Sequence, residues 1–230
     1  MTSLGVDAVL PAGSRLFHDA GCLRVSADRP LRCISNALVG GGLGRVQHFC
    51  NFHVDKSYMG ADPAGDLRDW LRRAGVDAEE SLAMMTAVQL EHHAVHCAAG
   101  VLAVVTAGTG NAVDITAPMT TDTRVVGTIN TLVIVDAALT DAGLVNACLS
   151  ATEARVRALQ VRGVRDPQTG TPASGTSTDC LAIAVTDNGL PGDYAGSATR
   201  VGRRLGHAVF RATCLALDAT QAWAAAETAR

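Results

Sequence analysis

The chain has 230 residues, of which 48% are hydrophobic and 18% charged, and its net charge is −3. Its single lysine, Lys56, and its scattered arginines argue against a nucleic-acid-binding protein, which neutralises phosphates with clustered positive charge. The seven cysteines form no CxxC pair, and no apolar run approaches the roughly 20 residues that span a bilayer. We therefore expect a cytoplasmic protein with no membrane contact.

Short apolar runs separated by Gly and Pro fill the chain up to about residue 54, a rhythm typical of successive strands and turns. A short helix is predicted over residues 62–74, where Asp62 can cap the first turn. The runs GVLAVVTAG (100–108) and INTLVIVDA (129–137) are continuous, rich in Val and Ile and too short for buried helices. They predict central strands of a sheet.

The second half of the chain alternates helix and strand. Apolar residues recur at helical spacing after Thr140, which can cap the helix, and CLAIAV (180–185) predicts a further strand. A Gly/Pro loop then leads to a long amphipathic C-terminal helix, whose end is apolar enough to pack on a second copy in a homo-oligomer. No linker divides the chain, so we predict one α/β (α+β) domain over residues 1–230, with a mixed sheet covered by helices.

Four hydroxyl groups and one carboxylate crowd into SGTSTDC (174–180), directly before the apolar run of the last strand. In one interpretation these side chains only satisfy the backbone amides of a structured turn. In the other, the turn is a catalytic loop in which Thr176, Ser177 or Thr178 supplies a nucleophile or a donor, and Asp179 orients or deprotonates it. The residues alone leave both interpretations open.

Two further loops carry polar side chains at the ends of predicted strands. Asn111 follows a Gly-rich turn after the strand at 100–108, and Thr128 and Asn130 stand at the entrance of the next strand. Crevices beyond strand ends are where open α/β sheets bind ligands, so all three are candidate substrate-binding residues. The alternative is that each ties down its own loop, because Asn and Thr readily bond nearby backbone.

Glu153 lies between small residues in the middle of an otherwise apolar predicted helix. A carboxylate in such a place is costly unless it is paired or hydrated, and desolvation raises the pKa of a carboxyl into a range suited to acid/base catalysis. We therefore expect a buried, catalytic Glu153. The alternatives are an ion pair with Arg155 or Arg157 and a position that faces solvent.

Histidines and aromatic residues offer fewer candidates. The stretch EHHAVH (91–96) has neither HExxH nor a third ligand at a recognisable spacing, so we predict no metal site. Asn51 and His53 alternate in NFHVDK and would point to one side of a strand, either as substrate-binding residues or as a face turned to water. The few side chains able to stack on a broad, flat ligand are Trp70, Trp223, Tyr58 and Tyr194.

Seven stretches of the chain, taken in order, carry a further signal. They are SNALVGGGL (35–43), NFHV (51–54), MMTAV (84–88), VVTAGTGNAV (104–113), GTINTLVIVDAALTDAGLVNACLSATEARVRAL (127–159), ASGTSTDCLAIA (173–184) and DYAGSATRVGRRLGHAV (193–209). Together they resemble the adenosylcobinamide amidohydrolase family over about residues 30–210. One departure lies in the hydroxyl-rich turn, where Ser174 and Ser177 interrupt the TGTGTD pattern expected of that family.

The resemblance implies hydrolysis of the amide that joins the aminopropanol arm of adenosylcobinamide to the corrin propionate, giving adenosylcobyric acid and 1-amino-2-propanol. It implies no separate cofactor, because cobalt belongs to the corrinoid substrate. Such a reaction needs an activated oxygen nucleophile, donors for the oxyanion and an acid for the leaving amine. The side chains available for these roles are those of Asn111, Asn130, Glu153, Thr176, Thr178 and Asp179.

Two other functions compete with this one. A corrinoid-binding salvage protein without hydrolytic activity would not need the carboxylates and hydroxyls, and a different amidohydrolase would keep the loops and change the pocket. His53 carries one more hypothesis, in which its imidazole occupies the lower axial position on the cobalt of bound cobinamide.

Overall fold

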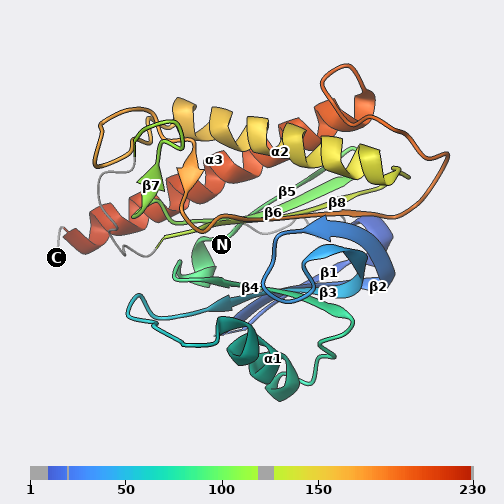
Figure 1. Cartoon of the computed structure of the whole chain (residues 1–230), viewed down its shortest axis with the longest axis horizontal. Coiled ribbons are helices and arrows are strands. Elements are labelled where there is room, and N and C mark those ends of the chain that lie inside the picture. Colours follow the sequence, from blue (N-terminus) through green and yellow to red (C-terminus); the bar gives the residue numbers. More distant parts are fainter. Residues whose placement is uncertain (1–9, 20, 119–126, 229–230) are drawn as a thin grey trace.

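The computed structural model describes residues 10–19, 21–118 and 127–228 (Figure 1). These residues form an eight-stranded mixed sheet of order β4-β3-β2-β10-β8-β6-β5, with β1 paired to β2. Its strands are β1 (Arg15–His18), β2 (Cys22–Ser35), β3 (Gly42–His53), β4 (Ser81–Thr86), β5 (Ala94–Ala98), β6 (Val101–Ala107), β8 (Ile129–Val135) and β10 (Cys180–Val185). The remaining elements are a two-stranded ribbon of β7 (Ala112–Val113) and β9 (Gly175–Thr176), the helices α1 (Pro63–Arg73), α2 (Asp141–Val161) and α3 (Arg200–Thr228), and two short 3-10 turns, Pro11–Gly13 and Leu90–His92.

The continuous apolar runs form the centre of the sheet, as predicted. Every residue of β6 and of β8 is buried, which is expected of strands covered on both faces. β8 and β10 run parallel with Asn130 opposite Cys180, while β6 runs antiparallel to β8 with Thr106 opposite Asn130. The beginnings of β8 and β10 and the end of β6 therefore meet at one end of the sheet.

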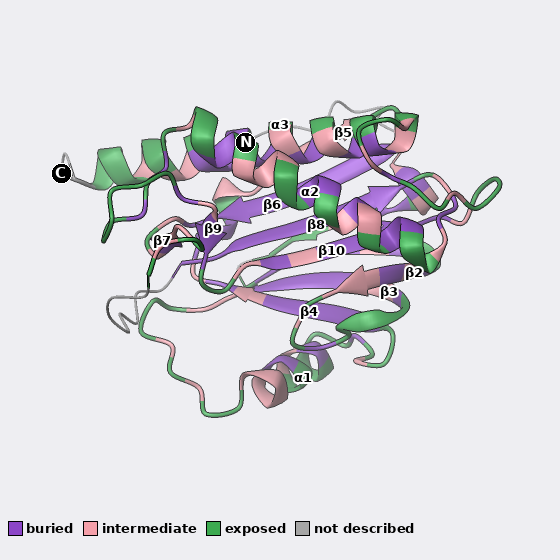
Figure 2. Ribbon diagram, turned by 45° about the horizontal axis from the view of Figure 1, so that its top comes forward, coloured by how far each residue is buried: buried purple, intermediate pink, exposed green. Residues whose placement is uncertain are grey.

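Two long helices cover one face of these strands (Figures 1 and 2). α2 begins after Thr140, whose hydroxyl accepts a hydrogen bond from the Gly143 amide at 3.2 Å, and α3 is the long C-terminal helix predicted from the sequence. The buried residues of both helices are mainly Ala with a few Leu, which lets the helices pack closely on the strands. The α+β fold class is confirmed. No helix in the described ranges is long and apolar enough to cross a membrane.

The sheet curls, so that its other face closes on itself. Phe49 of β3 and Met84 of β4 pack in one buried cluster with Val104 of β6, although neither β3 nor β4 is a neighbour of β6 in the sheet order. An irregular stretch in the pairing of β2 with β3 marks the bend. α1 covers the outer side of the curled part, where its Leu67 and Leu71 are fully buried (Figure 1).

The histidine-rich stretch 91–96 joins the edge of the sheet to α3. Its first residues belong to the 3-10 turn Leu90–His92, and its last residues belong to β5. The ring of His96 lies 5.6 Å from that of His207 on α3, and His96 Nε2 is buried without a hydrogen-bond partner among the described residues.

The predicted self-association of α3 stays a prediction.

Burial lowers the pKa of His96, and the neighbouring His207 and Arg211 lower it further. The unfolded chain therefore binds a proton where the folded protein does not, and the free energy of unfolding falls as the pH drops below about 6.5. We expect His96→Phe to reduce this loss, measured by urea unfolding at a pH about one unit above and one unit below that value. His207→Gln removes only a secondary cause of the lowered His96 pKa, and it should reduce the loss of unfolding free energy less than His96→Phe does. Identical pH dependence in all three proteins would contradict this account.

Candidate active site at the start of β8 and β10

Most of the predicted polar residues lie at the end of the sheet where β8 and β10 begin. The small β7–β9 ribbon lies beside this end (Figure 2). Asn111 Nδ2 donates to Ser177 Oγ at 2.6 Å, and Thr128 Oγ1 donates to the Thr178 carbonyl at 2.8 Å. These contacts join loops that are far apart in the sequence. The loops of Asn111 and Thr128 and the hydroxyl-rich turn therefore meet at this end of the sheet.

Asp179 is the centre of this network. Its Oδ1 accepts hydrogen bonds from the Ile129 amide at 3.0 Å and from the Thr176 hydroxyl, and its Oδ2 accepts one from the Thr176 amide at 3.0 Å. Arg155 Nη2 lies 3.3 Å from Oδ2, in an ion pair whose side chains are only 12% and 11% exposed. A carboxylate has about four lone-pair sites, and all four are occupied here. Asp179 thus fixes the turn, β8 and α2 relative to one another.

The hydroxyls of two threonines of the turn donate to other groups of the protein. The Thr176 hydroxyl donates to Asp179, and Thr178 Oγ1 donates to the Gly127 carbonyl at 2.7 Å. Gly175 has no room for a side chain, because a Cβ there would lie 2.5 Å from Asp179 Oδ2. Both threonines therefore serve the turn itself, as the structural interpretation of the sequence expects.

Ser177 differs from the two threonines in the use of its hydroxyl. Ser177 and Thr178 are both exposed, but Ser177 Oγ accepts the hydrogen bond from Asn111, and no acceptor among the described residues takes its hydroxyl hydrogen. Asn111 is held close to Gly127, where a Cβ would lie 2.3 Å from Asn111 Oδ1. Ser177 is thus the hydroxyl of the turn that is free to act on a ligand.

Two buried asparagines join the curled halves of the sheet. Asn130 Nδ2 donates to Asn51 Oδ1 at 2.9 Å and to the Met85 carbonyl at 2.7 Å, and Asn130 Oδ1 accepts a hydrogen bond from Thr128 Oγ1 at 3.0 Å. Asn51 Nδ2 donates to Thr106 Oγ1 at 2.9 Å. We call Asn51, Thr106 and Asn130 the amide clasp. Both amide hydrogens of Asn130 are used within the protein, so this side chain holds the fold together at the site.

A cavity of about 20 Å³ lies against the amide clasp. It occupies the space inside the curl of the sheet, between the β2–β4 part and the β6–β8 part. Apart from the clasp its walls are apolar. The lining residues are Leu23, Val25, Phe49, Asn51, Met84, Val104, Thr106, Asn130 and Leu132.

His53 ends β3 two residues after Asn51, and therefore points to the same side of the strand. It is half-buried and lies opposite Thr86 of β4. The chain continues from Thr86 to Val88, which packs so closely on Gly108 that a Cβ on that glycine would lie 2.7 Å from Val88 Cγ2. His53 thus lies at the rim of the same end of the sheet.

The expected burial of Glu153 is wrong. Glu153 is exposed on α2, and the reason for predicting an acid/base role is lost with it. Arg155 follows two residues later, which is nearly the opposite side of an α-helix, and it is the buried charged residue. The small residues that suggested burial, such as Ala151, face the core instead.

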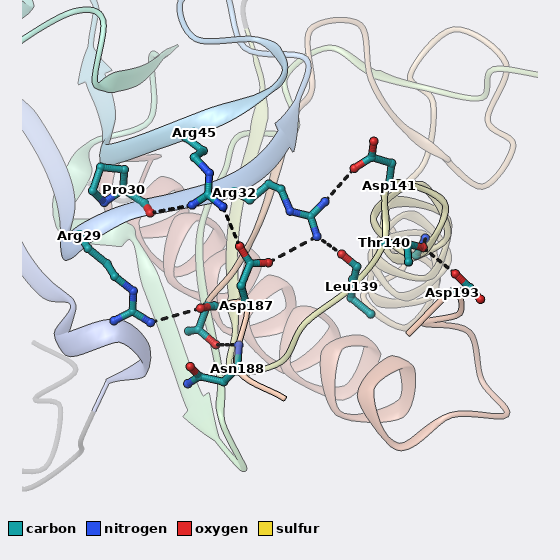
Figure 3. Close-up of polar contacts among 12 residues, drawn as sticks. Arg29, Pro30, Arg32, Arg45, Leu139, Thr140, Asp141, Asp187, Asn188 and Asp193 are labelled. Atoms are coloured by element: carbon teal, nitrogen blue, oxygen red, sulfur yellow. Dashed lines mark hydrogen bonds and ion pairs between the residues drawn. The ribbon is translucent and has the colours of Figure 1, made fainter. Parts of the chain in front are cut away.

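Tyr194 is not brought to the site. Its neighbour Asp193 accepts a hydrogen bond from the Thr140 hydroxyl at 2.9 Å, which places this loop at the beginning of α2 (Figure 3). At a rise of 1.5 Å per residue, Arg155 lies roughly 20 Å further along the helix. Tyr194 is 73% exposed at that distant end and cannot stack on a ligand held by the turn.

The end of the molecule near Tyr194 carries a cluster of arginines (Figure 3). Arg32 pairs with Asp141 at 2.7 Å and with Asp187 at 3.4 Å, and Arg45 pairs with Asp187 at 3.1 Å. These ion pairs link β2 and β3 to the beginning of α2 and to the loop after β10. The charges are used within the protein, so the cluster is a structural clamp.

Comparison with known protein families connects this geometry to an activity. Residues 8–225 match the family model described as adenosylcobinamide amidohydrolase. The chain belongs to the adenosylcobinamide amidohydrolase family. It is 29% identical over 184 residues to the adenosylcobinamide amidohydrolase of Methanosarcina mazei. The matched region covers 75% of this chain and 84% of that protein. It is also 35% identical over 95 residues to the uncharacterized protein MJ1613 of Methanocaldococcus jannaschii, covering 40% of this chain and 36% of that protein.

The match confirms the predicted family and extends beyond the segment in which the resemblance was recognised. The sequence did not point to Arg155, Thr106 or Asn36 as members of the candidate site. Asn36 Nδ2 donates to the Asp179 carbonyl at 2.8 Å, and its Oδ1 accepts from the Leu181 amide at 2.8 Å, so it holds the turn from the other side. Its place in the motif SNALVGGGL was the available signal.

The ion pair between Arg155 and Asp179 should be measurable as stability. We expect Arg155→Met to lower the free energy of unfolding by about 3 kcal/mol, because it leaves the Asp179 charge buried without its cation. Arg157→Met, on the exposed side of the same helix, should change it by less than about 0.5 kcal/mol. Urea denaturation compares the two variants, and equal stability would show that the ion pair does not hold the turn.

Proposed function

We propose that this chain hydrolyses the amide bond between the aminopropanol arm and the corrin propionate of adenosylcobinamide, releasing adenosylcobyric acid and 1-amino-2-propanol. Membership of the family, over residues 8–225, is the observation that carries the proposal. The site adds one exposed hydroxyl whose hydrogen no described residue accepts, that of Ser177, on a turn fixed by the partly buried hydrogen bonds of Asp179. The proposed reaction needs no separate cofactor, since cobalt is part of the substrate.

In the proposed mechanism Ser177 Oγ attacks the carbonyl carbon of the amide. The C–N bond breaks, aminopropanol leaves with the hydroxyl proton on its nitrogen, and the corrin acyl group remains as an ester on Ser177. Water then hydrolyses the ester and restores the hydroxyl. Asn111 Nδ2 holds Oγ at 2.6 Å, and its second hydrogen is available to the carbonyl oxygen as negative charge develops there.

We assign the proton transfer to His53. The oxygens of Asp179 are fully occupied, and Glu153 is exposed on the far side of its helix. His53 lies at the rim of the site, and imidazole is the side chain that most often moves protons near neutral pH. It would accept the proton of Ser177 during attack and return it to the leaving nitrogen.

Turnover in heavy-oxygen water tests the function. We expect the chain to convert adenosylcobinamide to adenosylcobyric acid carrying one heavy oxygen, with 1-amino-2-propanol as the second product, both identified by mass spectrometry. Ser177→Ala should lower turnover at least about 100-fold. Ser174→Ala is the matched control, because the Ser174 hydroxyl donates to the Val113 carbonyl of β7 at 3.2 Å, and it should keep most of the activity.

Acid quenching during turnover should trap the corrin acyl group on the peptide that contains Ser177. Activity without such an adduct, and with full turnover in Ser177→Ala, would overturn the role of Ser177. Corrinoid binding by the unmodified chain without any product would overturn the hydrolytic function and favour a carrier.

His53→Gln should lower turnover by about 100-fold or more while corrinoid binding is retained. His48→Gln, on the same strand, is the control and should stay near the activity of the unmodified chain, since His48 Nδ1 bonds Ser26 Oγ at 2.9 Å away from the site. The visible spectrum of the bound corrinoid separates two roles. An unchanged spectrum in His53→Gln agrees with proton transfer, whereas a change would mark His53 as an axial ligand of cobalt.

A further inference from the structure

The cavity beside the amide clasp has one polar wall with hydrogen-bonding capacity to spare. Thr106 Oγ1 accepts a hydrogen bond from Asn51 Nδ2 at 2.9 Å, and no acceptor among the described residues takes the Thr106 hydroxyl hydrogen. The second hydrogen on Asn51 Nδ2 is also left over. Thr106 and Asn51 are only 1% and 6% exposed. Buried donors without acceptors cost free energy, so this wall favours a group that offers lone pairs.

The size and polarity of the cavity restrict that group. About 20 Å³ is roughly the room that one water-sized group needs, such as a hydroxyl or a methyl. No cationic side chain lines the cavity, which disfavours a carboxylate or a phosphate. The apolar wall, which includes Met84 and Val104, suits a hydrocarbon attached to the polar group.

Hydrogen bonds of Thr128 link the polar wall of the cavity to the turn. Thr128 Oγ1 lies 2.8 Å from the Thr178 carbonyl, one residue from Ser177, and 3.0 Å from Asn130 Oδ1. Asn130 lines the cavity. The amide clasp and the turn that carries Ser177 therefore adjoin each other at the same end of the sheet.

We propose that this cavity receives the hydroxyl group at the end of the aminopropanol arm, with Thr106 and Asn51 as donors to the hydroxyl oxygen and the carbon that bears it against the apolar wall. The inference rests on the proposed function and adds a specificity-determining residue, Thr106, to it. The chain thereby selects amides whose amine carries a 2-hydroxyl over amides of a plain alkylamine.

The test compares two substrates, adenosylcobinamide and the N-propyl amide of adenosylcobyric acid, which lacks only the hydroxyl. We expect the unmodified chain to prefer the hydroxylated arm by about tenfold in kcat/KM. Thr106→Val, which removes the hydroxyl and keeps the shape, should bring this preference close to one by lowering kcat/KM for the hydroxylated arm alone. Thr106→Ser keeps the donor and should keep the preference.

Val104→Ile provides a second test that does not depend on the Thr106 variants. Val104 is 6% exposed and lines the cavity, so an added methylene would fill the space and lower kcat/KM for both arms. Equal use of the two substrates by the unmodified chain, or an unchanged preference in Thr106→Val, would overturn the inference while hydrolysis itself stands. Failure to hydrolyse either amide would instead refute the proposed function.

Discussion

One buried carboxylate organises the end of the sheet where the candidate site lies. Only 11% of the Asp179 side chain is exposed, so its charge has to be met by protein donors. Those donors come from three parts of the chain, namely the turn itself, the beginning of β8 and the middle of α2. Satisfying one charge therefore fixes the turn on the sheet. The hydroxyls before β10 divide around this turn: that of Thr176 bonds the carboxylate, that of Thr178 donates to the Gly127 carbonyl, and that of Ser177 is exposed.

The curl of the sheet supplies the second constraint. Asn51 and Asn130 are 79 residues apart in sequence and hydrogen-bond only because β3 and β4 fold over the inner face of β6 and β8. The apolar cluster inside the curl provides the driving force, and the amide clasp fixes the register in which the two parts meet. Polar groups placed inside such a cluster have to be paired, so the same hydrogen bonds that align the sheet also leave the spare donors of Thr106 and Asn51 at the cavity.

The convergence of separate loops could be predicted from the sequence, because Asn111, Asn130 and Asp179 all adjoin apolar runs that read as neighbouring strands. The inward face of α2 could not be predicted. Its sequence, DAGLVNACLSATEARVRALQV, has small or apolar residues on nearly every side, and its period does not define one buried stripe. Glu153 was therefore expected inside, where Arg155 lies. The loop that carries Tyr194 has no pattern that shows its direction. The role of Thr106 was hidden as well, because its partner Asn51 is 55 residues away and reaches it only through the curl.

Rigid and reactive polar groups are separated within this small region. The fold uses the hydrogen bonds that are donated by Thr176, Thr178 and Asn130. Other side chains keep hydrogens that no described residue accepts, namely those of Ser177, Thr106 and Asn51. A reacting group gains from such an arrangement, because a nucleophile held by fixed neighbours loses little freedom when the substrate arrives. In the proposed reaction the corrin is far too broad for a cavity of about 20 Å³, so the group that enters the cavity belongs to the narrow arm that carries the amide. The position of the arm then decides which carbonyl meets the Ser177 hydroxyl. The same hydrogen-bonded frame, from α2 through Asp179 to β8, determines the position of the arm and that of the hydroxyl.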